Sequence, residues 1–136
     1  MTAEAASDVD LCVIPKPALE ALLSRSAPLE HRVMMQALRE LDEARDWMVT
    51  LERKTAAEKV ASFLYLIATH MDPTDDATET SFDLPLSRAD IGDFLGLTVE
   101  TVSRQISRLK ADGVIGIVNF RQISVPDLAR LRLRCG

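Results

Sequence analysis

The segment that decides the fold of this chain is LSRADIGDFLGLTVETVSR, residues 86–104. Ser87 and Thr98 are typical first residues of helices, because their side-chain oxygens accept hydrogen bonds from free backbone N–H groups of the first turn. Asp90 follows Ser87 by three residues and predicts a capping box. Gly96 ends the first helix, since glycine adopts the left-handed backbone that a tight turn requires. The segment therefore predicts a helix, a turn and a second helix, the arrangement of a helix-turn-helix DNA reader.

The first turns of the second predicted helix carry three polar side chains on one face. Glu100, Ser103 and Arg104 share this face because they lie three and four residues apart. Arginine can donate to O6 and N7 of guanine, glutamate can accept from N4 of cytosine, and serine can bond to either kind of edge. The pattern predicts that these three residues read bases in the major groove. An alternative interpretation concerns the helix alone, because Glu100 complements the helix dipole and Arg104 can pair with it.

Other side chains near this helix are expected to position it on DNA. Contacts with phosphates fix register and orientation without specifying sequence. The residues expected near the DNA besides the three base readers are Val99, Thr98, Arg108, Lys110 and Arg121. Val102, Ile106 and Leu109 form the apolar stripe of the helix. We expect Ile106 to supply the packing, because Gln105 occupies a position that many helix-turn-helix proteins give to an aliphatic residue.

The surrounding residues complete a winged helix-turn-helix. Ile91, Phe94 and Leu95 are expected to face the core from the first helix. Gly113 ends the second helix, and two β-rich runs then predict a hairpin. The further elements expected are a strand over 81–84, hairpin strands over 114–118 and 122–125, and a short helix from Pro126 to about Leu133. The wing would span Ile115 to Ser124, with Arg121 near its tip. The fold class is thus mainly α with a small β-hairpin.

Residues 29–54 contain no proline or glycine and predict one long helix. Apolar residues recur along it with alternating spacings of three and four, which is a heptad seam. The seam consists of Met34, Ala37, Leu41, Ala44, Met48 and Leu51. The pattern predicts a two-stranded coiled coil with a second copy of the chain. The alternative is an amphipathic helix packed on its own domain, because Val33, Leu38 and Trp47 widen the apolar stripe.

The chain is expected to divide into three regions. Residues 1–28 hold a strand candidate, Asp8 to Ile14, and a short helix from about Pro17 to Ser24. Residues 29–54 form the dimerisation helix. Residues 55–136 form the winged helix-turn-helix domain. A helix predicted from Lys54 to Met71 opens it, and the wide apolar face of this helix predicts burial.

The charge of the chain is unevenly distributed. The net charge is −5, which by itself opposes binding to DNA. Residues 98–136 carry seven basic and three acidic residues, a net charge of +4, whereas residues 1–97 carry −9. We therefore expect the basic end to meet phosphates while the acidic remainder stays clear of them.

Several classes of function are excluded by what the sequence lacks. It has no apolar run long enough to cross a membrane and no signal peptide, so a cytoplasmic protein is expected. Cys12 and Cys135 lack metal-ligand spacing and are expected to be free thiols. No nucleophile–base pair, metal cluster or phosphate-binding glycine loop is present, which argues against an enzyme.

The segment 86–104 closely resembles the Fnr and FixK branches of the Crp/Fnr superfamily of bacterial transcription regulators. The pattern Glu-x-x-Ser-Arg, here Glu100, Ser103 and Arg104, is the reading motif of these branches. The resemblance implies a homodimer that recognises a two-fold DNA site with TTGA-type half-sites and that contacts or blocks RNA polymerase. Residues 29–54 match the family's dimer helix, and residues 8–25 match its preceding strand and short helix.

Family members usually carry an upstream effector β-roll, and the resemblance implies that residues 1–28 are a remnant of it. The family's iron–sulphur cysteines and cyclic-nucleotide contacts would lie in the missing part, so no cofactor is expected in this chain. The chain is then a fragment, a mis-started reading frame or a natural short form. An alternative function is a dimerising fragment that sequesters full-length relatives without binding DNA itself.

Overall fold

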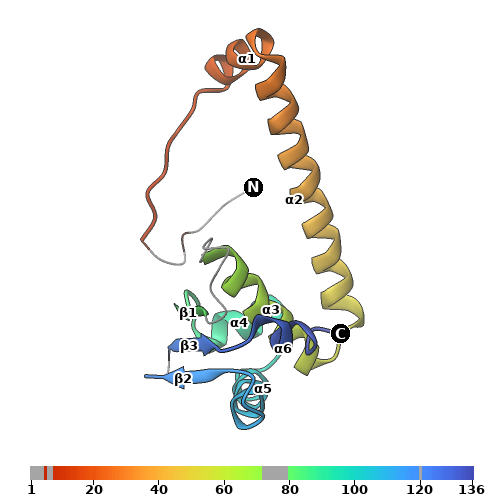
Figure 1. Cartoon of the computed structure of the whole chain (residues 1–136), viewed down its shortest axis with the longest axis vertical. Coiled ribbons are helices and arrows are strands. Elements are labelled where there is room, and N and C mark those ends of the chain that lie inside the picture. The colour runs from red at the N-terminus through yellow and green to blue at the C-terminus, as the bar shows by residue number, and fades with distance from the viewer. Residues whose placement is uncertain (1–4, 6–7, 72–79, 120) are drawn as a thin grey trace. The chain divides into compact units, whose positions relative to one another are not determined.

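The computed structural model of this chain describes residues 5, 8–71, 80–119 and 121–136 and is mainly helical (Figure 1). It divides into two compact units, Met1–Met48 and Val49–Gly136, with one long helix shared between them. The elements are α1 (Lys16–Arg25), α2 (Ala27–Arg53), α3 (Ala56–Met71), β1 (Thr80–Asp83), α4 (Arg88–Leu95), α5 (Val99–Ala111), β2 (Gly116–Val118), β3 (Gln122–Val125) and α6 (Leu128–Arg132). The predicted fold class is confirmed.

The first unit begins with an irregular segment. Residues 8–15 form neither helix nor strand, so the strand predicted from Asp8 to Ile14 is wrong. A strand needs a neighbour for its backbone hydrogen bonds, and the sheet in the described part of the chain consists of β1, β3 and β2 alone. The short helix is present as α1, with Pro15 before it and Pro17 in its first turn.

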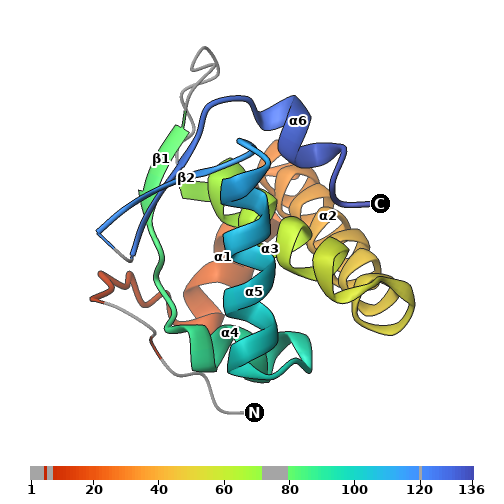
Figure 2. The ribbon, with the colours of Figure 1, turned by 90° about the horizontal axis from the view of Figure 1, so that it is seen from below.

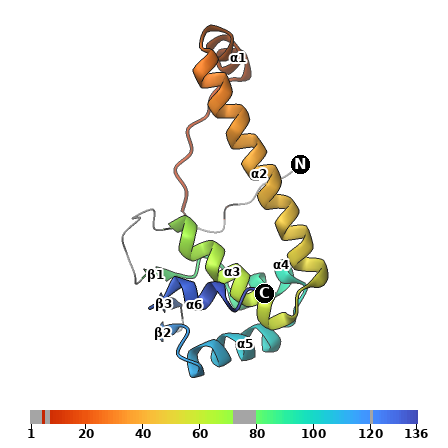
Figure 3. The same ribbon diagram turned by 45° about the vertical axis from the view of Figure 1, so that its right-hand side comes forward.

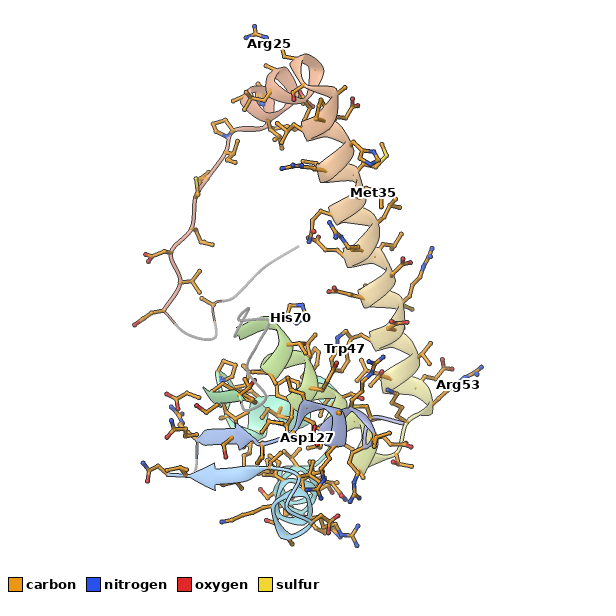
Figure 4. All side chains as sticks on the ribbon, viewed as in Figure 1. Arg25, Met35, Trp47, Arg53, His70 and Asp127 are labelled. Atoms are coloured by element: carbon orange, nitrogen blue, oxygen red, sulfur yellow. The ribbon has the colours of Figure 1, made fainter. Side chains whose placement is uncertain are left out.

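The long helix α2 extends over 27 residues, or about 40 Å at 1.5 Å per residue. It begins at Ala27, two residues before the predicted start, because Ser26 Oγ accepts a hydrogen bond from Leu29 N (3.4 Å) and Pro28 suits a first turn. Figure 4 marks Met35 along this helix and Arg53 at its end. Thr50 is the buried residue of α2, and Trp47 is half-buried, whereas the other large apolar residues of α2, including Met34, are exposed.

The second unit packs around α3. Helices α5 and α6 and strand β1 contact α3, and α4 packs against α5 (Figures 2 and 3). The largest fully buried side chains come from α3, α4, α5, β3 and α6 and from the turn after α5: Val60, Leu64, Ile91, Leu95, Val102, Ile106, Val114, Ile123, Val125 and Leu131. A single apolar core therefore holds the sheet and the helix-turn-helix together.

The sheet is antiparallel, with strand order β1-β3-β2. Ile123 of β3 lies between Phe82 of β1 and Ile117 of β2. The hairpin is shorter than predicted, because Val114 and Ile115 precede β2 and are buried as part of the turn that leaves α5.

Three further expectations need correction. The final helix begins at Leu128 and not at Pro126, because the Asp127 side chain accepts hydrogen bonds from the N–H groups of Ala129 and Arg130 and caps the helix there. It ends at Arg132 and not at Leu133.

Phe94 does not face fully inward. It is 46% exposed, and its ring packs against the edge of the core at Phe63, with ring centroids 5.9 Å apart.

The start of α3 also differs from the sequence interpretation, which placed it at residue 54. Thr55 caps the helix: its Oγ1 accepts from Glu58 N (3.3 Å), and the Glu58 carboxylate accepts from Thr55 N (2.8 Å). This reciprocal capping box was recoverable from the Thr-x-x-Glu spacing. The Glu58 carboxylate accepts hydrogen bonds from the backbone and from the side chain of Thr55. Both bonds lower the pKa of Glu58, and the backbone bond has the larger effect.

Candidate nucleic-acid interface

The beginning of α4 confirms the predicted capping box. Ser87 Oγ accepts a hydrogen bond from Asp90 N (3.2 Å), and the Asp90 carboxylate accepts from Ser87 N (3.1 Å) and Ser87 Oγ (2.6 Å). The bonds from the Ser87 side chain and the Ser87 backbone both lower the pKa of Asp90, and the side-chain bond has the larger effect. The start of the helix-turn-helix is thus determined by local hydrogen bonds.

The turn after α4 depends on two glycines. Gly96 has φ +65°, a left-handed conformation that favours glycine. Leu97 N donates to Gly92 O at 2.8 Å, which folds the turn back onto α4. A Cβ at Gly92 would lie 2.6 Å from the Leu97 carbonyl oxygen, so only glycine fits without movement of the backbone. The role of Gly96 was predicted from the sequence. The role of Gly92 was not, because it depends on this close approach.

Thr98 caps α5 as predicted. Its Oγ1 accepts from Thr101 N at 3.2 Å and lies 2.9 Å from Thr101 Oγ1. Thr98 therefore orients the first turn of α5, where Val99 and Glu100 are exposed.

The two faces of α5 differ as the sequence predicted. Val102, Ile106 and Leu109 are buried, whereas Glu100 and Arg104 are exposed and Ser103 is half-buried. Neither Glu100 nor Arg104 forms an ion pair with any described residue, so the pairing of these two with each other is absent here. The carboxylate and the guanidinium remain available at the surface, beside the half-buried hydroxyl.

Gln105 lies on the flank of α5 and is only 9% exposed. Ile106 is fully buried, so both residues are covered, and Ile106 supplies the apolar packing as expected. Gln105 lines a cleft of about 240 Å³ together with Ala57, Arg108, Leu109, Asp112 and Arg134. This cleft lies between the start of α3, the second half of α5 and the C-terminal residues.

The remaining candidate contacts lie at the end of α5 and on the wing. Arg108 and Lys110 are exposed in the last turns of α5. Arg121 is exposed at the start of β3, and its carbonyl oxygen accepts from Leu84 N at 2.9 Å. Asn119, at the turn between β2 and β3, has φ 55°. The wing is therefore anchored to the residue that follows β1.

No group of three or more metal-ligating side chains occurs among the described residues. Within the same residues, no helix is long and apolar enough to span a membrane. Cys12 and Cys135 are free thiols, as predicted. Cys135 is buried, and burial raises its pKa.

Comparison with known proteins identifies the fold of the second unit. Residues 58–134 match the family described as Crp-like helix-turn-helix domain. The chain belongs to the Crp/Fnr family. Its resemblance to the Fnr and FixK branches is confirmed by relatives of those names.

Three similar relatives are named as activators or regulation proteins. A probable transcriptional activator of Rhizobium leguminosarum bv. viciae is 58% identical over 131 residues, covering 96% of this chain and 54% of that protein. The transcriptional activator protein FnrL of Cereibacter sphaeroides is 42% identical over 135 residues, covering 97% and 54%. The nitrogen fixation regulation protein FixK of Bradyrhizobium diazoefficiens is 40% identical over 130 residues, covering 96% and 54%.

The structure of FixK2 from Bradyrhizobium japonicum resembles this Crp/Fnr chain with a TM-score of 0.74 and 36% identity. The match covers 90% of this chain and 60% of FixK2. The chain thus spans about half the length of the curated relatives it matches. Two of the curated relatives are named as transcriptional activators and the third as a regulation protein, which agrees with the expectation that the chain is not an enzyme.

Proposed function

We propose that this chain is a DNA-binding transcription regulator that inserts α5 into the major groove. The observation that carries the proposal is the division of α5 into a buried apolar face and an exposed polar face, within a winged helix-turn-helix of the Crp/Fnr family. Glu100, Ser103 and Arg104 occupy the N-terminal half of the helix, which is the part that reaches base edges in this motif. Arg104 reads guanine, Glu100 reads cytosine, and Ser103 contributes a smaller contact.

Phosphate contacts flank this reading surface. The residues proposed for these contacts are Thr98 before α5, Arg108 and Lys110 at its C-terminal end, and Arg121 on the wing, whereas Val99 enters the groove beside the reading residues. The exposure of the three basic side chains supports the assignment. Such contacts supply affinity and its salt dependence but little discrimination between sequences.

A second copy of the chain pairs with the first along α2. The support is an apolar seam that the chain leaves exposed: Met34, Leu41, Met48 and Leu51 are exposed large side chains at heptad spacing, with Ala37 and Ala44 between them. Two reading helices then fit two TTGA-type half-sites about 34–36 Å apart. Bound near a promoter, the dimer contacts RNA polymerase or blocks it, and it acts in the cytoplasm.

Fluorescence anisotropy tests the proposal directly. The full chain is titrated into a labelled TTGATNNNNATCAA duplex and into a scrambled duplex of the same composition, over a series of salt concentrations. We expect the palindrome to be preferred tenfold or more, with two chains per duplex. Equal and weak binding to both duplexes, with a steep salt dependence, would contradict base reading.

The exposed seam also supports a second candidate function, a dimerising fragment that sequesters longer relatives. Mixing the chain with a full-length relative and measuring mixed dimers by native mass spectrometry tests it. Mixed dimers that do not bind the palindrome, formed by a chain that does not bind it alone, would favour this second function over the first.

A further inference from the structure

The C-terminal end of α5 is held by side chains from the end of the chain. Arg134 Nη2 lies 3.0 Å from Asp112 Oδ2, and the two side chains are about half exposed. Arg130 donates from Nη1 to Gly113 O at 3.4 Å and from Nη2 to Asp112 O at 3.3 Å. Two arginines of the C-terminal segment therefore contact the residues that end α5, the helix that carries the reading residues.

The carbonyls that Arg130 reaches are ones that the helix itself does not satisfy. Helix α5 ends in a Schellman motif: Gly113 has φ +65°, Gly113 N donates to Lys110 O (3.0 Å), and Val114 N donates to Leu109 O (2.9 Å). The carbonyls of Asp112 and Gly113 lie beyond these bonds. A guanidinium there also complements the negative end of the helix dipole.

The C-terminal segment is itself fixed to α3. The Cys135 carbonyl accepts from Ser62 Oγ at 3.5 Å, and Ser62 Oγ accepts from Lys54 Nζ at 3.1 Å. Leu131 is fully buried and Cys135 is 9% exposed, so the arginines lie on a packed support. These interactions connect α3, through residues 130–135, to the end of α5. Figure 3 shows the elements α3, α6 and α5 that they join.

We infer that Arg130 and Arg134 are positioning residues that hold the reading helix at its C-terminal end, rather than part of the basic surface that meets DNA. The inference rests on the proposed function, since it assigns to α5 the reading of bases. With both arginines engaged to Asp112 and Gly113, the direction of α5 relative to α3 is defined at both ends: by Thr98 and the turn at one end, and by the C-terminal segment at the other. A shift of the helix axis would displace Arg104 from its base edge.

Arg132 provides a matched control. Its side chain is exposed in the last turn of α6, two residues from each positioning arginine, and forms no hydrogen bond or ion pair with any described residue. Replacing it by alanine removes the same charge from the same segment without removing a contact to α5.

The test compares Arg130→Ala, Arg134→Ala and Arg132→Ala in the full chain, by anisotropy with the palindromic and scrambled duplexes over a salt series. We expect Arg134→Ala and Arg130→Ala to weaken binding to the palindrome about two- to fivefold, the range that an exposed ion pair supports. Binding to the scrambled duplex and the slope of log K against log salt stay as in the parent. Arg134→Lys, which retains a charge opposite Asp112, recovers most of the loss.

Hydrogen exchange supplies a readout that does not involve DNA. The amides of residues 109–114 should exchange faster in Arg134→Ala and Arg130→Ala but not in Arg132→Ala, with thermal unfolding confirming that all variants are folded at the assay temperature. The two measurements separate the two proposals. A parent chain that does not prefer the palindrome refutes the reading function, whereas the exchange rates of these amides test the contacts to α5 independently of DNA.

Two results would overturn the inference. If Arg134→Ala and Arg130→Ala match Arg132→Ala in both binding and exchange, the contacts to Asp112 and Gly113 have no role in holding α5. If either variant lowers the salt slope by about 1, that arginine contacts a phosphate and belongs to the DNA surface.

Discussion

The two units of this chain treat their apolar residues in opposite ways. The second unit, Val49–Gly136, buries them around α3, where Leu64, Ile91 and Ile106 are fully covered. In the first unit, Leu11, Val13 and most apolar residues along α2 are exposed. The difference teaches that the second unit has a core of its own, whereas most apolar residues of α2 are not covered by any described part of the chain.

This contrast agrees with the two roles that we propose, DNA reading by α5 and dimerisation along α2. A helix-turn-helix must present its reading face in a fixed geometry, and fixed geometry follows from dense packing on the other face. A dimerisation seam must instead remain open until a second copy covers it. The predictions below test whether the two units depend on packing in these different ways.

The largest effect is expected in the core of the second unit. Ile106→Ala should lower the free energy of unfolding by about 2–5 kcal/mol, because it leaves a cavity in a fully buried position. Urea unfolding followed by circular dichroism measures it. Ser107→Ala, at the exposed neighbouring position, should change the same quantity by less than about 0.5 kcal/mol. Equal effects of the two variants would mean that α5 is not packed as described.

The turn between α4 and α5 should be almost as sensitive. Gly92→Ala places a Cβ against the Leu97 carbonyl oxygen and should cost about 1–3 kcal/mol in unfolding free energy. Gly96→Ala meets open space but requires a left-handed alanine, so a smaller cost of about 1 kcal/mol is expected. A cost at position 92 below that at position 96 would contradict the close approach at Gly92.

Arg104→Ala tests the exposed face of the same helix. It should weaken binding to the palindromic duplex by about 1–3 kcal/mol and relax the preference for guanine, since one bidentate contact is lost. The free energy of unfolding should hardly change, because the Arg104 side chain is exposed and forms no hydrogen bond or ion pair with a described residue. If the variant binds palindromic and scrambled duplexes like the parent, Arg104 does not read bases.

On α2 the expected effect is on association and not on folding of the second unit. Leu41→Glu places a charge in the seam and should weaken dimerisation about tenfold or more, as measured by analytical ultracentrifugation. Met35→Glu, which introduces the same charge on the same helix away from the seam (Figure 4), is the control and should leave the dimer intact. Loss of the dimer in both variants would contradict dimerisation through the seam.

The smallest effect concerns acid sensitivity of the helix caps. The pKa of Asp90 is lowered by hydrogen bonds from Ser87, so its contribution to stability is present above the pKa of the unfolded chain and is lost as pH falls through the lower folded pKa. Stability of the second unit should therefore decline below about pH 4. Asp90→Asn should reduce this decline, whereas Asp93→Asn, on the same helix and outside the box, should not. Urea unfolding at pH 7 and pH 3 compares them.

Features that depend on neighbours in sequence were predicted well. The caps at Ser87 and Thr98, the glycine at 96 and the polar face of α5 all rest on hydrogen bonds or spacings within four residues. Where tertiary contacts decide, prediction failed. Asp8 to Ile14 has β-forming residues but no neighbouring strand, and Phe94 follows the apolar pattern but lies at the edge of the core beside Phe63.

The sequence by itself thus determined the beginning and end of α4 and the beginning of α5, and which residues α5 leaves exposed, because those properties follow from local hydrogen bonds and helical periodicity. Only the tertiary structure decided which residues hold α5 in place. Strand β1 beside β3 and Arg134 with Asp112 join segments far apart in the sequence, whose approach no local rule encodes. Their geometry arises from the common core, in which the elements must pack together to exclude water from their apolar faces.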